Sequence, residues 1–226
     1  MDDATSEIYS MFLVEEEGTA SSFRGLGETI AAKGLFSSLY TDRGSHYFFT
    51  PKAGEKVDKT RLTQVGRALA EISIEHIPSY SPEGRGRMER VFGTLQNRLP
   101  PVLRLKQITT LEAANRFLAE SYMAEHNARF AVAAAEEGSA FVPFAGDLKE
   151  VLCIREQRVV SNDNCVRYDG RILQIPEQRH RRHFVKATVT VHAYPDSTLA
   201  IFHGPRLLAR YTAEGNLIGE ETRLAA

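Results

Sequence analysis

The stretch from Ile77 to Gln96 reads IPSYSPEGRGRMERVFGTLQ and gives the strongest structural signal in the chain. A strand closes at Pro78, a glycine-containing loop follows, and apolar residues then return at helical spacing, which predicts a helix over about residues 87–99. The apolar side of this helix contains Met88, Val91, Phe92, Leu95 and Leu99. Glu89 lies in the first turn, off that side. Pro100-Pro101 is expected to end the helix.

Strands and helices alternate along the part of the chain that surrounds this stretch. β-Branched and aromatic residues predict a strand at 7–14, and helical patterns follow at 19–33, 61–71 and 111–127. Two further runs, 35–41 and 72–77, have the composition or alternation of strands. Alternation of this kind indicates an α/β layer domain, which we assign to residues 1–135.

After Ala135 the pattern changes to short strands separated by turn residues. Residues 136–148 have the composition of a linker, and strands are predicted at 151–160, 165–168, 171–174, 184–192, 199–203 and 206–211. Tyr168-Asp169-Gly170-Arg171 and His203-Gly204-Pro205-Arg206 predict hairpin turns. We therefore expect a small all-β barrel over 149–212, followed by a tail over 213–226.

The bulk composition excludes few classes of function. Lys plus Arg number 28 against 29 Asp plus Glu, so the net charge does not indicate a nucleic-acid partner. No apolar run reaches the roughly 18 residues of a membrane span, and the first seventeen residues are acidic where a signal peptide is basic. Cys153 and Cys165 lack metal-ligand spacing and suit reduced thiols. We expect a cytoplasmic protein without a membrane partner.

Two acids occupy positions where a catalytic carboxylate is useful. Asp42 follows the apolar run that ends at Thr41, so it is expected at the carboxyl end of a buried strand, where α/β sheets bind ligands. Together with Glu89 it could hold Mg²⁺ or Mn²⁺, since these ions prefer oxygen ligands. On spacing alone the signal is weak, because most α/β domains place some acid after a strand and some Glu on a helix. A hydrolase built on Ser45, His46 and Asp42 lacks the nucleophile-elbow motif.

Three motifs add a family resemblance. Tyr40–Ser45 (YTDRGS), Ile77–Gln96 and His126–Val132 (HNARFAV) resemble the acid-bearing and C-terminal motifs of integrase-core (DDE) transposases, in particular the ISNCY group of insertion-sequence transposases. The resemblance extends from Asp2 to about Tyr211. It implies a ribonuclease-H-like core that cleaves DNA strands and transfers them by two-metal-ion phosphoryl transfer, with two Mg²⁺ or Mn²⁺ ions held by three carboxylates.

Within this resemblance Asp42 is the second acid and Glu89 the third. The first acid of the family lies on a strand that precedes the turn here formed by Asp2–Ser6, so we expect a core that lacks its first strand, in an N-terminally truncated chain that is inactive alone. The alternative is a non-catalytic DNA-binding or assembly remnant of a transposase. The family acts on transposon ends and target DNA as a homo-oligomer, with no small-molecule substrate.

Basic residues form two clusters that could contact DNA. Arg85, Arg87 and Arg90 flank Glu89, and Arg179, Arg181, Arg182 and Lys186 lie in the expected barrel. Solvated surface charge is the alternative interpretation of both clusters. Next to a metal site built for DNA, however, arginines of this kind suit phosphate contacts, which position DNA without reading its sequence.

Overall fold

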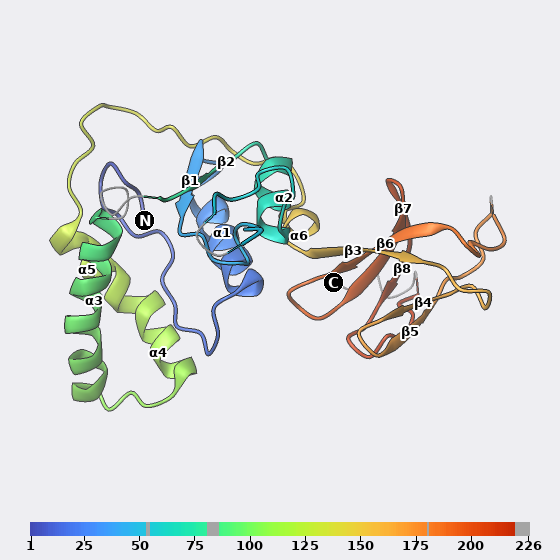
Figure 1. The fold of residues 1–226 in the computed structure, drawn as a ribbon. Helices are drawn as coiled ribbons and strands as arrows, with labels where there is room; N and C mark the ends of the chain where they lie inside the picture. Colours follow the sequence, from blue (N-terminus) through green and yellow to red (C-terminus); the bar gives the residue numbers. More distant parts are fainter. Residues whose placement is uncertain (53–54, 81–85, 180, 220–226) are drawn as a thin grey trace. The chain divides into compact units, whose positions relative to one another are not determined.

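The computed structural model describes residues 1–52, 55–80, 86–179 and 181–219 (Figure 1). The chain divides into two compact units, Met1–Gly146 and Asp147–Ala226. No helix among the described residues is long and apolar enough to cross a membrane.

A parallel pair of strands lies at the centre of the first unit's α/β part. Helix α1 (Thr19–Lys33) precedes β1 (Ser38–Thr41), and α2 (Gln64–Glu71) precedes β2 (Glu75–Pro78). The register runs from Ser38 opposite Glu75 to Thr41 opposite Pro78, so both strands end at the same edge. The buried residues of the two helices include Phe23, Leu26, Ile30, Val65, Ala68 and Leu69. The predicted α/β alternation is confirmed for these four elements.

The segment 7–14, which the sequence predicts as a strand, has no strand structure. Two helical side chains bind the backbone of two of its residues instead. The Asn127 amide accepts from Ile8 N and donates to Ile8 O, both at 2.9 Å, and the Asn115 amide makes the same pair of bonds with Leu13, at 2.6 and 2.9 Å. No described strand lies beside the segment, so these amides replace the missing ladder.

Four helical elements follow in the described part of the first unit. α3 (Gly86–Leu105) is followed by α4 (Leu111–Phe117), one π-helical turn η2 (Leu118–Tyr122) and α5 (Met123–Phe130). The prediction that Pro100-Pro101 ends the helix is wrong, because α3 continues to Leu105. The carbonyls that lose their donors belong to Gln96 and Asn97, which are exposed to water. Leu99, Leu118 and Tyr122 form a buried cluster that extends to Val102 and Leu103, beyond the prolines.

Part of the expected linker at 136–148 is packed onto the first unit. Leu35 and Val142 form an antiparallel bridge in which Leu35 N donates to Val142 O at 2.7 Å and Val142 N donates to Leu35 O at 2.9 Å. The Phe141 ring meets the rings of Tyr9 and Phe36 edge-on, at 5.5 and 6.4 Å. The segment thus stabilises the approach to β1.

The second unit is built from antiparallel strands, after a short helix α6 (Leu148–Val151). Its strands are β3 (Ile154–Val159), β4 (Cys165–Tyr168), β5 (Arg171–Gln174), β6 (Thr188–Ala193), β7 (Leu199–His203) and β8 (Arg206–Tyr211). One sheet has the order β3-β6-β7-β8, and β4-β5 forms a separate hairpin. Both contribute to one buried core around Val166, Leu173, Val191 and Ile201. Closure into a barrel stays a prediction.

Both hairpin turns predicted from the sequence are confirmed. Asp169 and Gly170 have φ of 47° and 72° between β4 and β5, and Gly204 has φ of 56° between β7 and β8. Left-handed residues of this kind give a tight turn whose twist matches that of the strands.

Candidate active site

Asp42 lies immediately after β1, at the edge where β1 and β2 both end. Its side chain is exposed, and its Oδ1 accepts the backbone N–H of Gly44 at 2.8 Å. Tyr47 N donates to Gly44 O at 2.9 Å, which closes the next turn of the loop. No described residue donates to Oδ2. The carboxylate is therefore held by its own loop with one oxygen turned to solvent.

The loop after Asp42 also positions a histidine. Nε2 of His46 is buried without a hydrogen bond and lies 3.6 Å from Glu17 Oε1. A Cβ placed on Gly44 would lie 3.0 Å from His46 Cε1 and 3.1 Å from Asp42 Oδ1, so glycine lets the ring and the carboxylate approach each other. The contact with Glu17 gives no support to the hydrolase arrangement of Ser45, His46 and Asp42.

A second histidine, His76 on β2, contacts Thr41, the residue before Asp42. The sequence analysis did not single it out. The Thr41 hydroxyl donates to Asp42 O at 2.9 Å, so it accepts from His76 Nε2, also at 2.9 Å. The His76 ring stacks on Phe48 with centroids 4.0 Å apart. Burial, helped by the positive charge of Lys59, lowers the pKa of His76 to about 4. The ring is thus neutral at physiological pH and carries its proton on Nε2.

This buried neutral histidine makes the first unit sensitive to acid. The folded pKa of about 4 lies below the ordinary 6.5, so the unfolded chain takes up the proton first and stability falls as pH drops from about 6.5 to about 4. Allowing for partial solvent access, we expect a loss of up to about 2 kcal/mol. Urea unfolding of wild type and His76→Gln across this range tests it, with His183→Gln, at an exposed loop position, as control. A wild-type slope retained in His76→Gln would contradict the assignment.

The chain that leads to Glu89 leaves from the same edge as Asp42. Ser79 N donates to Thr41 O at 2.9 Å, and the Arg43 guanidinium lies 5.2 Å from the centre of the Tyr80 ring. The loop after Asp42 and the segment after β2 are therefore neighbours as far as Tyr80. Glu89 is exposed in the first turn of α3, four residues after the end of the undescribed stretch 81–85. The approach of Glu89 to Asp42 stays a prediction.

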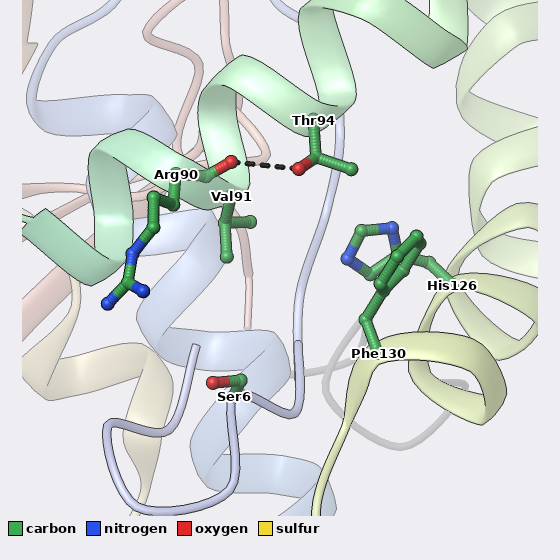
Figure 2. Close-up of a pocket in the computed structure, with 6 residues that line it drawn as sticks. All are labelled: Ser6, Arg90, Val91, Thr94, His126 and Phe130. Carbon is green, nitrogen blue, oxygen red and sulfur yellow. Dashed lines mark hydrogen bonds between the residues drawn. The ribbon is translucent and has the colours of Figure 1, made fainter.

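The arginines around Glu89 are only partly described. Arg85 lies outside the described residues, and so does the side chain of Arg87. Arg90 Nε donates to Gly86 O at 3.1 Å, one turn earlier in α3. Arg90 lines a pocket of about 310 Å³. The other residues that line it are Ser6, Val91, Thr94, His126 and Phe130 (Figure 2). Arg90 is thus engaged with its own helix, and a phosphate contact would have to replace that bond.

The four basic residues that the sequence singled out in the second unit lie between β5 and β6. Arg179 and Lys186 are exposed and form no ion pair with a described residue. Arg181 Nε donates to His183 O at 2.8 Å, and its guanidinium lies 4.7 Å from the centre of the Phe184 ring. Arg182 is paired with Glu177 at 3.5 Å, with both side chains exposed. Such an exposed pair is weak, so Arg182 can exchange Glu177 for another anion.

The described residues contain no group of three or more His, Cys, Asp or Glu that could hold a metal ion. The Asp42 carboxylate is therefore exposed and held by its loop. The described part of the chain does not contain a complete set of metal ligands around it. The two-metal centre implied by the family resemblance stays a prediction.

The sequence of the chain is similar to those of proteins named as transposases. The chain is 32% identical over 204 residues to a putative transposase (y4bF) of Sinorhizobium fredii, an alignment that covers 89% of this chain and 44% of the relative. It is 27% identical over 188 residues to the transposase for insertion sequence IS1202 of Streptococcus pneumoniae, with 83% and 40% covered. No family model matches the chain. The chain thus spans less than half the length of these curated relatives.

Proposed function

We propose that this chain is part of a DNA transposase of the integrase (DDE) type and that Asp42 and Glu89 are two of its metal-binding carboxylates. The similarity to proteins named transposases supports the general class. The observation that carries the catalytic role is the position of Asp42 at the carboxyl edge of the parallel pair β1–β2, from which the segment leading to Glu89 also departs. A parallel pair preceded by helices also supports a ribonuclease-H-like core.

The residues suit Mg²⁺ or Mn²⁺ by their chemistry. Asp42 and Glu89 are exposed carboxylates, and hard divalent ions prefer such oxygens. When bound, the ions of a two-metal centre activate the attacking hydroxyl and stabilise the leaving oxygen of a phosphoryl transfer. The contribution of this chain is to hold the Asp42 carboxylate in place through Gly44 N–H. Arg90 is the described arginine of this cluster, and a contact with a DNA phosphate would replace its bond to Gly86 O.

Metal binding tests the two acids without requiring activity. We titrate the whole chain with Mn²⁺ and measure free Mn²⁺ by electron paramagnetic resonance. Asp42→Asn and Glu89→Gln are each expected to weaken binding about tenfold or more, since even outer-shell changes cost that much. Glu112→Gln, an exposed acid in the first turn of α4, is the matched control. An equal effect of all three variants, or a wild type that binds no Mn²⁺, contradicts the assignment.

We expect no strand transfer from these 226 residues by themselves. Two carboxylates hold a divalent ion less well than three and repel each other, so the site needs a further ligand. DNA and further copies of the chain are the proposed partners. Duplex binding without Mn²⁺ binding would favour the alternative, a non-catalytic DNA-binding or assembly role.

A further inference from the structure

The pocket lined by Arg90 lies within the first unit, and neither Asp42 nor Glu89 is among the residues that line it. Three segments form its walls (Figure 2): the first half of α3, the end of α5 and the turn that ends at Ser6. Its volume of about 310 Å³ is that of a site for a small ligand. The chemistry of the walls therefore indicates what the pocket can bind.

His126 on α5 is a buried polar residue that faces the pocket. It is 5% exposed, and its ring nitrogens form no hydrogen bond within the part of the chain that the structure describes. Burial, helped by the positive charge of Arg98, lowers the pKa of His126, so the ring is neutral at physiological pH. A neutral imidazole offers one donor and one acceptor, and Figure 2 shows one nitrogen turned toward the α3 side of the pocket. Because buried polar groups normally have partners, His126 indicates a polar ligand atom in the pocket.

Arg90 supplies a positive charge at the α3 wall. Its Nε donates to Gly86 O at 3.1 Å, and its terminal nitrogens form no hydrogen bond or ion pair with the described residues. A carboxylate or phosphate group inside the pocket can meet these nitrogens in place, and the planar guanidinium can bind such groups with two parallel bonds. A DNA phosphate outside the pocket would instead have to draw the side chain away from Gly86. Arg90 thus favours an anionic group inside the pocket.

Two apolar side chains, Val91 on α3 and Phe130 at the end of α5, also line the pocket. The centre of the Phe130 ring lies 4.7 Å from that of His126 and 5.1 Å from the Arg98 guanidinium. Aromatic rings prefer offset or edge-on contacts with one another. A ligand with a planar ring can therefore extend this aromatic pair.

The walls of the pocket are joined to one another. Val132 N, just after α5, donates to Thr5 O at 2.9 Å, which fastens the N-terminal turn to the end of that helix. Arg98 connects α3 with α5 through its contact with the Phe130 ring. A preformed site binds its ligand without the entropic cost of ordering its walls.

We propose that this pocket binds a small organic anion that carries an aromatic ring. Arg90 holds the carboxylate or phosphate group of the ligand, Phe130 contacts its ring, and His126 bonds to a polar atom at its edge. The inference goes beyond the proposed function, because it concerns neither the two metal-binding acids nor DNA.

Nuclear magnetic resonance of the whole chain with isotope-labelled histidine tests the site. The probes are naphthoate and adenosine monophosphate, which differ in their anionic group, and their neutral counterparts naphthamide and adenosine. Assignment through the backbone identifies the His126 signal without a variant. This signal is expected to shift with at least one of the two anions, at a dissociation constant of about 1 mM or lower, whereas the signals of His183 and His203 in the second unit stay unchanged.

Arg90→Gln separates a built anion site from a mere hollow. Because a charge-assisted hydrogen bond is lost, the variant is expected to weaken binding of the anion about tenfold and to leave the neutral counterpart unchanged. The matched control is Arg104→Gln, which removes an exposed cation from the last turn of the same helix and should change neither.

Three outcomes would overturn the inference. They are the absence of a His126 shift with either anion, equal effects of Arg90→Gln and Arg104→Gln, and a shift that a DNA duplex causes but neither small anion does. The last outcome would make Arg90 a nucleic-acid contact. All three leave the Mn²⁺ titration of Asp42 and Glu89 unaffected, so the proposed function stands or falls separately.

Discussion

Replacing Glu150 by leucine is expected to lower the free energy of unfolding of the second unit by roughly 3 kcal/mol. The side chain of Glu150 is three-quarters buried. Its carboxylate joins His192 on β6, Tyr194 just after β6 and Arg210 on β8. It accepts from the Tyr194 hydroxyl at 2.8 Å, from Arg210 Nη2 at 2.7 Å and lies 3.0 Å from His192 Nδ1. Removing it leaves a half-buried guanidinium and two polar groups without their acceptor, and such losses are costly.

Glu150→Gln separates charge from shape. The amide keeps the volume and one acceptor oxygen but loses the attraction to Arg210, so about half of the effect should remain. Urea unfolding followed by circular dichroism measures both variants. Glu156→Gln is the matched control, because the pair of Glu156 with Arg158 is more exposed than that of Glu150 with Arg210, and more exposed pairs contribute less. An equal loss of unfolding free energy in Glu150→Gln and Glu156→Gln would show that the buried network stabilises the unit no more than an ordinary ion pair does.

The same network predicts an acid limb in the stability of the second unit. Burial alone would raise the pKa of Glu150, but hydrogen bonds from Arg210, Tyr194 and His192 outweigh it and lower the pKa. Asp196 behaves similarly: burial opposes, yet bonds from Lys149 and Thr198 lower its pKa to about 2. A carboxyl group whose pKa is lowered by folding contributes its full stabilisation at a pH above its pKa in the unfolded chain, which is near 4.5 for Glu150. This contribution is lost as the pH falls toward the pKa of the folded state. Glu150→Gln should flatten this limb.

Local sequence signals predicted the hairpins well and could not predict this network. Each hairpin turn depends on the backbone preferences of its own two central residues, Asp169-Gly170 or Gly204-Pro205. Four consecutive residues are therefore enough to predict it. Glu150, His192, Tyr194 and Arg210 meet because α6, β6 and β8 pack together, and nothing in their spacing records it. Contacts fixed by tertiary packing have no short-range signature.

The two wrong element predictions have the same origin. Residues 7–14 have strand composition, but a strand exists only with a partner, and here Asn115 and Asn127 satisfy the backbone. Pro100-Pro101 normally ends a helix, but the apolar contacts of Val102 and Leu103 with the Leu118 cluster carry α3 past it. In both places tertiary contacts override local propensity.

The candidate site was predictable to the extent that it depends on strand ends. The apolar run before Asp42 predicted its position at the end of a strand, which the structure confirms. The prediction that this strand is buried is wrong, because no residue of β1 is buried and Tyr40 is 56% exposed. Three partners of this edge had no sequence signal strong enough to select them. In the sequence, His76 fits the alternation of a strand, Glu17 is an ordinary surface acid, and Tyr80 is an ordinary aromatic residue of a loop. His76 and Tyr80 lie at this edge because β1 and β2 are parallel neighbours, whereas Glu17 reaches it through its contact with His46.

Gly34→Ala is expected to have the largest effect on the first unit, a loss of about 4 kcal/mol of unfolding free energy. Gly34 follows α1 with φ of 102° and ψ of −173°, a region that only glycine adopts readily. A Cβ there would lie 2.6 Å from Val142 O, which already accepts from Leu35 N at 2.7 Å. Relief of the clash requires breaking this bridge, and Leu35 lies three residues before β1.

Gly138→Ala separates the clash from the backbone strain. Gly138 also has φ of 102°, but a Cβ there would meet no atom within 4 Å. It should therefore cost only about 1 kcal/mol, the usual penalty of the left-handed region. Chemical unfolding of both variants gives the difference, which measures the Leu35–Val142 contact. Because that bridge fixes the entry into β1, Gly34→Ala should also weaken Mn²⁺ binding at Asp42, whereas Gly138→Ala should not. Equal costs at the two glycines would mean that residues 141–142 do not hold the strand that carries Asp42.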